Sequence, residues 1–241
     1  MENLFALYTY LGRYQQISIV NDGPFNIITS EGNEWPSMVY NQQGELSTAN
    51  LVQLKKTLSR STCKTLILKD SISDHELSIL KELRFMPVTR WYNMSKQLTE
   101  KQFGGELANL DVCLCDTIES IEQWISVASK VLFKGQLLPK DVLLDAVKEG
   151  KFKLLLGKTK DTPVSTLMVY CGDEAGIYMV ATEQEQQKKG FGKIMMSEAE
   201  KLVYNAGYRC VCLHATQVGM PLYTSLGYQA YNSLILFYNF N

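Results

Sequence analysis

Apolar residues recur at regular spacing along residues 110–240, the second half of the chain. Positions 118, 121, 124, 125, 128 and 132 are apolar, which predicts an amphipathic helix over residues 118–133. Similar patterns predict helices over 139–148 and 191–204, and a short helix that ends at Gly227. Alternating or continuous apolar runs predict strands over 110–115, 152–158, 164–170, 177–182, 208–214 and 233–240. The second half is therefore predicted to be an α/β domain.

The first half has a less regular pattern. It predicts strands over 37–41, 65–69 and 88–92, and helices over 49–58 and 74–83, the second with Asp74 as its N-cap. A polar stretch over 96–109 contains Gly104 and Gly105, which is typical of a linker or turn. We therefore predict two domains, residues 1–105 and residues 106–241.

A loop with two glycines lies between the strand ending at Thr182 and the helix beginning near Phe191. Its spacing is Gln187-x-x-Gly190-x-Gly192. Such a loop directs backbone N–H groups and the positive end of a helix dipole toward one point, which suits a pyrophosphate. Lys188, Lys189 and Lys193 add positive charge. The spacing matches neither the Walker loop nor the dinucleotide fingerprint.

The loop resembles the coenzyme A loop of the Gcn5-related N-acetyltransferase (GNAT) superfamily, Arg/Gln-x-x-Gly-x-Gly/Ala. Residues 215–228 resemble the last signature of that family, in which Ala215 precedes Tyr223, Leu226, Gly227 and Tyr228. The resemblance implies a mixed, mostly antiparallel GNAT-type sheet flanked by helices. The first half is either a degenerate GNAT-like copy, as in tandem members of the family, or an unrelated α/β cap. It has no Gly-x-Gly at the matching place, so we expect no coenzyme there.

The resemblance also implies which residues form the site. Tyr223 matches the general acid that protonates the departing thiolate, although it could instead only pack. Coenzyme contacts are expected from Met179, Val180, Thr182, Gln187, Lys188, Lys189, Gly190, Phe191, Gly192 and Lys193. The first three would act through their backbone, and the lysines could equally form a solvated face.

The general base is not identified. Many relatives carry a Glu in the strand before the loop, but residues 177–182 contain no carboxylate. Glu174 lies earlier, and Glu183 and Glu185 lie in the loop. His214 could serve as a base, and water is the other candidate.

Composition narrows the class of protein. The chain has 241 residues, 46% of them hydrophobic, and a formal net charge of −1, so we expect an ordered protein that binds neither nucleic acid nor an anionic membrane. The first residues lack the features of a signal peptide, which favours a cytoplasmic protein. The Cys113–Cys115 and Cys210–Cys212 pairs lie in predicted strands and fit buried thiols better than a zinc site, so no metal is expected.

The sequence therefore predicts an N-acetyltransferase that moves an acetyl group from acetyl-CoA, a cosubstrate, to a primary amine. The amine belongs to an unidentified small molecule or peptide. The alternatives are a non-catalytic acyl-CoA-binding regulatory module and a nucleotide-binding protein. A homodimer is compatible with the sequence.

Overall fold

Eleven strands form one continuous mixed sheet in the computed structural model, which describes residues 2–41, 46–100 and 109–240. Its order is β1-β2-β3-β4-β11-β5-β10-β9-β8-β7-β6. The strands are β1 (Ile17–Asp22), β2 (Phe25–Ser30), β3 (Ser37–Asn41), β4 (Thr65–Lys69), β5 (Phe85–Gln97), β6 (Asp111–Leu114), β7 (Phe152–Thr159), β8 (Thr162–Cys171), β9 (Ala175–Thr182), β10 (Cys210–Thr216) and β11 (Gln229–Asn239). The pairings are antiparallel except β3 with β4 and β9 with β10. This mixed, mostly antiparallel architecture confirms the predicted fold class.

Seven α-helices of the described residues flank the sheet. They are α1 (Glu2–Leu11), α2 (Thr48–Leu58), α3 (Asp74–Glu82), α4 (Ile118–Leu132), α5 (Lys140–Lys148), α6 (Phe191–Asn205) and α7 (Met220–Ser225). A capping box formed by Thr117 and Ser120 begins α4. The N-cap of α3 is Ser73, whose side chain accepts from Glu76 N–H, so the prediction of Asp74 as the cap is wrong. No helix of the described residues is both long and apolar enough to cross a membrane.

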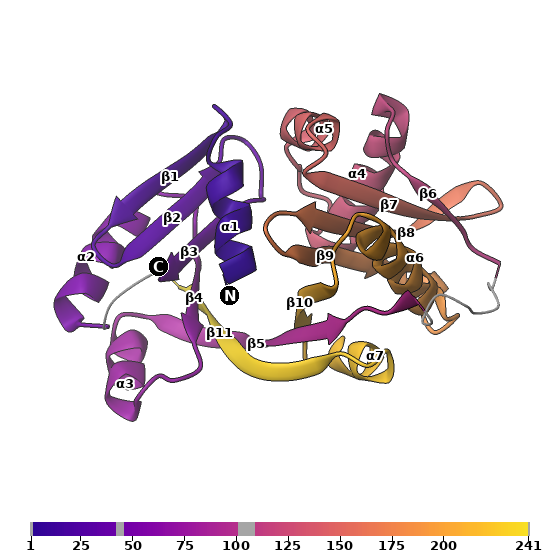
Figure 1. Cartoon of the computed structure of the whole chain (residues 1–241). Helices are drawn as coiled ribbons and strands as arrows, with labels where there is room; N and C mark the ends of the chain where they lie inside the picture. The colour runs from indigo at the N-terminus through magenta and orange to yellow at the C-terminus, as the bar shows by residue number, and fades with distance from the viewer. Residues whose placement is uncertain (1, 42–45, 101–108, 241) are drawn as a thin grey trace.

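Three buried clusters hold the layers together. One joins α1, α4 and α5 to one face of the sheet and contains Trp124 and Tyr40. A second packs α6 and α7 on strands β7 to β10 and contains Tyr223. The third packs α2 and α3 against the first strands and contains Phe25. Because α1 contributes to the first cluster together with both groups of strands, it joins the two halves of the molecule (Figure 1).

The two halves share their central strands. β11, the last strand of the chain, lies between β4 and β5, and β5 lies between β11 and β10. In Figure 1 these two strands run side by side across the bottom of the view, from one half of the molecule to the other. The predicted boundary between residues 105 and 106, and most of the predicted linker, lie outside the described residues.

Candidate active site

The site is built where β9 and β10 separate. These parallel strands pair at only three positions, from Ala175 opposite Val211 to Ile177 opposite Leu213. Beyond Ile177, β9 keeps β8 as its partner on one edge, and no other strand of the described residues takes the place of β10 on the other. Its backbone N–H and C=O groups on that edge can therefore bond to an extended ligand, as an added strand would.

A β-bulge in β9 lies at this separation. Met168 of β8 is opposite Tyr178 and Thr166 is opposite Ala181, so β9 carries one extra residue. Met179 takes a φ of 50°, in the left-handed region. The Thr166 hydroxyl donates to the Met179 carbonyl at 3.2 Å. The bulge is therefore held in a defined conformation that turns the backbone of β9.

The Trp124 indole of α4 satisfies a backbone group of the same region. Its N–H donates at 3.2 Å to the carbonyl of Leu167, the β8 residue that lies within the irregular register. Trp124 is fully buried. A buried carbonyl without a partner is costly, so this bond stabilises the bulged conformation.

A cavity of about 680 Å³ occupies the separation. Of the residues predicted for the site, it is lined by Met179, Val180, Thr182, Gln187 and Tyr223. His214, the candidate base, also lines it. The strand that was expected to contact the coenzyme through its backbone and the tyrosine that was expected to donate a proton thus border one cavity.

The loop after β9 presents backbone donors at the start of α6. Lys188 has a φ of 63° and Gly190, the N-cap, a φ of 84°. The N–H groups of Lys193 and Ile194 both donate to the Gly190 carbonyl. Within the described residues, those of Phe191 and Gly192 have no backbone acceptor. Free donors at the positive end of a 15-residue helix suit a phosphate group.

The two glycines of the loop are required for different reasons. No atom lies within 4 Å of a Cβ placed on Gly190, so its constraint is the positive φ. A Cβ on Gly192 would lie 3.0 Å from Leu222 Cδ2 of α7. Gly192 therefore permits the close packing of α6 on α7.

Side chains of the loop after β9 form hydrogen bonds within the loop itself. Gln187 Nε2 donates to the Thr182 carbonyl at 3.1 Å and closes the loop on itself. Lys189 Nζ donates to Gln186 Oε1 at 2.7 Å, while Phe191 is buried in the core. Lys188, Lys189 and Lys193 are exposed. Coenzyme contacts of these residues stay predictions.

Tyr223 is nearly buried, with 8% of its surface exposed. Its ring meets the Tyr228 ring edge-on, with centroids 6.0 Å apart. No described residue hydrogen bonds to its hydroxyl. Burial raises the pKa of Tyr223 to about 12, so the phenol keeps its proton at neutral pH.

His214 lies between two aromatic rings that line the same cavity. Its ring centroid is 6.2 Å from that of Trp91 and 6.0 Å from that of Tyr178. Neither ring nitrogen has a hydrogen-bond partner among the described residues. Burial lowers the pKa of His214 to about 3, so the imidazole is neutral and weakly basic. Among the carboxylates that the sequence offered, Glu183 forms an ion pair with Lys130 at 2.8 Å.

Much of the cavity wall comes from the first half of the chain, which sequence reasoning did not connect to the site. The residues are Leu4, Leu7, Tyr8, Glu34, Trp35, Ser37, Met38, Thr65 and Trp91. No short motif marks them. The signal available in the sequence was the content of large aromatic residues in a half that lacks a coenzyme loop, and it does not specify a position.

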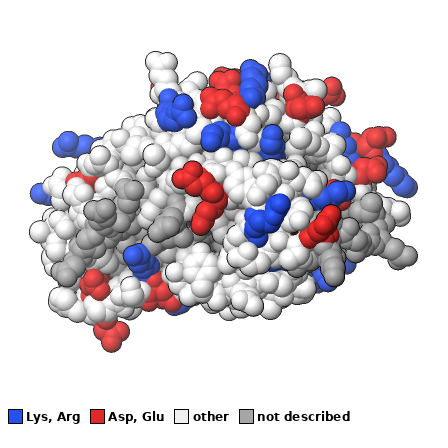
Figure 2. Space-filling model, in the orientation of Figure 1, with Lys and Arg blue, Asp and Glu red and all other residues white. Residues whose placement is uncertain are grey.

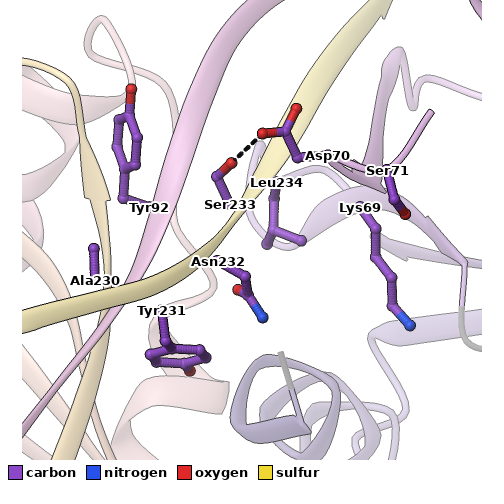
Figure 3. A pocket seen from close by; sticks show the side chains of 9 residues that line it. All are labelled: Lys69, Asp70, Ser71, Tyr92, Ala230, Tyr231, Asn232, Ser233 and Leu234. Atoms are coloured by element: carbon purple, nitrogen blue, oxygen red, sulfur yellow. Dashed lines mark hydrogen bonds between the residues drawn. The ribbon is translucent and has the colours of Figure 1, made fainter. Parts of the chain in front are cut away.

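A separate cavity of about 580 Å³ lies where β4, β5 and β11 meet (Figure 3). It contains none of the predicted coenzyme residues. Asp70 accepts hydrogen bonds from Arg90 and from the Ser233 hydroxyl, so this carboxylate ties the end of β4 to the two central strands. Its role there is structural.

The described residues contain no group of three His, Cys, Asp or Glu side chains placed to hold a metal ion. All six cysteines are free thiols. Acidic and basic side chains are intermixed on the face drawn in Figure 2, which agrees with the net charge of −1.

The geometry agrees with comparison to known families. Residues 119–228 match the model described as "Acetyltransferase (GNAT) family". The second half of the chain therefore carries a GNAT-family domain. No curated protein sequence matches the chain.

Solved structures extend the likeness in fold to nearly the whole chain. A GCN5-related N-acetyltransferase from Kribbella flavida has a TM-score of 0.72 at 14% identity, over 99% of this chain and 95% of its own. A functionally unknown conserved protein from Staphylococcus epidermidis has a TM-score of 0.65 at 15% identity, over 98% and 100%. A tandem GNAT protein from the clavulanic acid biosynthesis pathway has a TM-score of 0.59 at 9% identity, over 96% and 86%. The tandem neighbour fits the interpretation of the first half as a degenerate copy.

Proposed function

We propose that this protein transfers an acetyl group from acetyl-CoA to a primary amine. The observation that carries the proposal is the single cavity bordered by both the free edge of β9 and Tyr223. The GNAT-family match over residues 119–228 supports acyl transfer in general. The choice of acetyl-CoA and of a primary amine follows the resemblance of the sequence motifs to the GNAT superfamily and is part of the proposal.

The residues around the cavity have separate tasks in this proposal. Backbone N–H groups of Phe191 and Gly192 hold the pyrophosphate, and the edge of β9 beyond Ile177 holds the pantetheine arm. The N–H of Val180, next to the bulge, polarises the thioester carbonyl. Met179 and Thr182 contribute through their backbone, and Gln187, Lys188, Lys189, Gly190 and Lys193 shape and charge the loop.

The reaction is a direct transfer. The neutral amine nitrogen attacks the thioester carbon, so that a C–N bond forms as the C–S bond breaks. The departing thiolate takes the phenolic proton of Tyr223, which then recovers a proton from solvent. The proton lost by the amine leaves through water, because β9 carries no carboxylate.

The alternative is a binding module that holds an acyl-CoA without turning it over. The absence of a carboxylate from β9 and the weak basicity of His214 favour it. Thiol release from acetyl-CoA, measured across a panel of primary amines, distinguishes the two functions. Acetyl-CoA binding without turnover of any amine would favour the binding module. No binding of acetyl-CoA would contradict both.

A further inference from the structure

The cavity of about 680 Å³, called the cleft below, extends beyond the part of its wall that β9 forms for the coenzyme. Beyond β9, its wall is made by α1, by the segment around Trp35 and by β5, and it includes Leu4, Tyr8, Trp35, Met38 and Trp91. These side chains are apolar or aromatic. They also belong to the half of the chain that has no coenzyme loop, so this part of the cleft is available for a second substrate.

The described residues that line the cleft carry charge of one sign only, which is negative. Glu34 is the only charged side chain among its described lining residues, which include no Lys or Arg. The charged residues that line the neighbouring cavity, of about 990 Å³, are Arg13, Lys69, Lys151 and Glu174, and His214 borders both cavities. An acceptor that carried a carboxylate or phosphate would find no cation in the cleft, and burying an unpaired charge is costly. The cleft therefore disfavours anionic acceptors.

His214 provides a polar position on the apolar wall. Its two ring nitrogens are buried between Trp91 and Tyr178 and have no hydrogen-bond partner in the part of the chain that the structure describes. A neutral imidazole has one acceptor and one donor. An amine nitrogen next to His214 can satisfy the acceptor, whereas an acyl chain cannot. This difference favours an amine over a long acyl group as the occupant.

We propose that the acceptor is a primary amine on an uncharged, aromatic or similarly apolar body, bound against Trp35 and Trp91 with its nitrogen hydrogen bonded to His214. The inference rests on the proposed function, because it names the acceptor of that same site. His214 is a positioning residue in it. It orients the neutral amine toward the thioester.

The first experiment compares two amines that share one aromatic body. Full-length protein is assayed for thiol release with saturating acetyl-CoA and either 2-phenylethylamine or phenylalanine, which adds a carboxylate. We expect kcat/KM for 2-phenylethylamine to be larger by roughly 100-fold, the usual effect of an unpaired buried charge. A preference for phenylalanine would overturn the inference and direct attention to the cavity of Arg13, Lys69 and Lys151.

A second arm replaces acetyl-CoA by hexanoyl-CoA. A higher kcat/KM for the longer thioester would mean that the apolar wall holds an acyl chain, which also overturns the inference. Calorimetric binding of acetyl-CoA is measured in parallel. If the coenzyme does not bind, the proposed function fails and the inference fails with it. If it binds and only the amine preference is reversed, the inference fails alone.

The His214→Phe variant tests the positioning role, since it keeps a ring between Trp91 and Tyr178 and removes both nitrogens. We expect kcat/KM for the amine to fall by about 10- to 100-fold, with acetyl-CoA affinity and Tm unchanged. His75→Gln, which alters the other, exposed histidine, is the matched control. A loss of Tm with a proportional loss of rate, or no loss of rate, would remove His214 from the proposal.

Discussion

A substitution at Gly190 would test whether the loop backbone holds the coenzyme. Its φ of 84° is unfavourable for a β-branched residue, so Gly190→Val should cost about 1–2 kcal/mol and displace the loop. We expect acetyl-CoA affinity, measured by calorimetry, to fall at least tenfold while the protein stays folded. Gly207→Val, at the other end of α6, has a similar φ of 97° and equally open surroundings. This control should lose stability without losing affinity, and equal affinities in both variants would contradict the assignment.

A substitution at Tyr223 would test whether its hydroxyl donates a proton to the departing thiolate. Tyr223→Phe keeps the ring and its packing, so we expect coenzyme affinity and Tm to change little. The single-turnover rate should fall by about 10²–10⁴-fold if the hydroxyl is the acid. Tyr228→Phe removes the hydroxyl of the neighbouring buried ring, which does not line the cleft, and should leave the rate intact. An unchanged rate in Tyr223→Phe, at unchanged stability, would assign Tyr223 to packing alone.

His214 gives the protein a pH-dependent stability. Burial lowers its pKa to about 3, whereas an unfolded histidine titrates near 6.5. The unfolded chain therefore binds a proton first, and the free energy of unfolding falls as the pH drops from about 6.5 toward 3. We expect the Tm to decrease over this range, and to decrease less in His214→Phe. A parallel decrease in both proteins would show that the histidine titrates normally when folded.

The contact of α1 with β9 depends on the absence of a side chain at Gly176. A Cβ there would lie 2.0 Å from Asn3 Oδ1 and 2.7 Å from Tyr178 Cε2. Asn3 cannot easily move, because its amide donates to the Glu174 carbonyl at 2.8 Å and its oxygen accepts from the Tyr178 hydroxyl. The position of α1 beside the cleft is therefore set by Glu174, Gly176 and Tyr178, which are all distant from α1 in sequence.

A double-mutant cycle tests this contact. Gly176→Ala should lower the free energy of unfolding by about 1–3 kcal/mol, the usual cost of overpacking. In an Asn3→Ala background the same change should cost clearly less, because the clashing amide is gone. Denaturant unfolding of the four proteins measures the coupling. Additive effects of the two substitutions would mean that α1 is not held by this contact.

The sequence predicted those elements whose signal is local. The bounds of α4 and α6 differ from the predicted ones by a single residue, because one face of each helix is apolar over four turns. α1 was not predicted. Its apolar residues are spread around the helix, since α1 packs against both halves of the molecule. Met179 belongs to an apolar run typical of a regular strand, and nothing in that run indicates the bulge.

The candidate site was predicted where motifs carry it and missed where contacts are non-local. Gly190 and Tyr223 lie in recognisable spacings. Trp91 lines the same cavity from β5, 88 residues from Met179 of the bulge and 132 residues from Tyr223 in sequence. That proximity follows from the pairing of β5 with β10 and β11, and long-range strand pairing leaves no short pattern in the chain.

The shared strands predict that neither half folds by itself. A chain that starts at residue 109 lacks β5, the antiparallel partner of both β10 and β11. We expect it to be unfolded or aggregated and to bind no acetyl-CoA. Mixing it with a separate chain of residues 1–100 should restore binding by complementation. Parental acetyl-CoA affinity in the 109–241 chain alone would support residues 106–241 as an independent domain.

The position of β11 also has a consequence for synthesis. This strand is synthesised after all the other described strands, yet it fills the place between β4 and β5 near the middle of the sheet. At about 5–20 residues per second, the first half waits several seconds after its own translation before its edge at β4 is covered. During that interval an exposed edge is open to pairing with other chains. The nascent protein should therefore depend on protection of this edge until β11 has been synthesised, however stable the completed fold becomes.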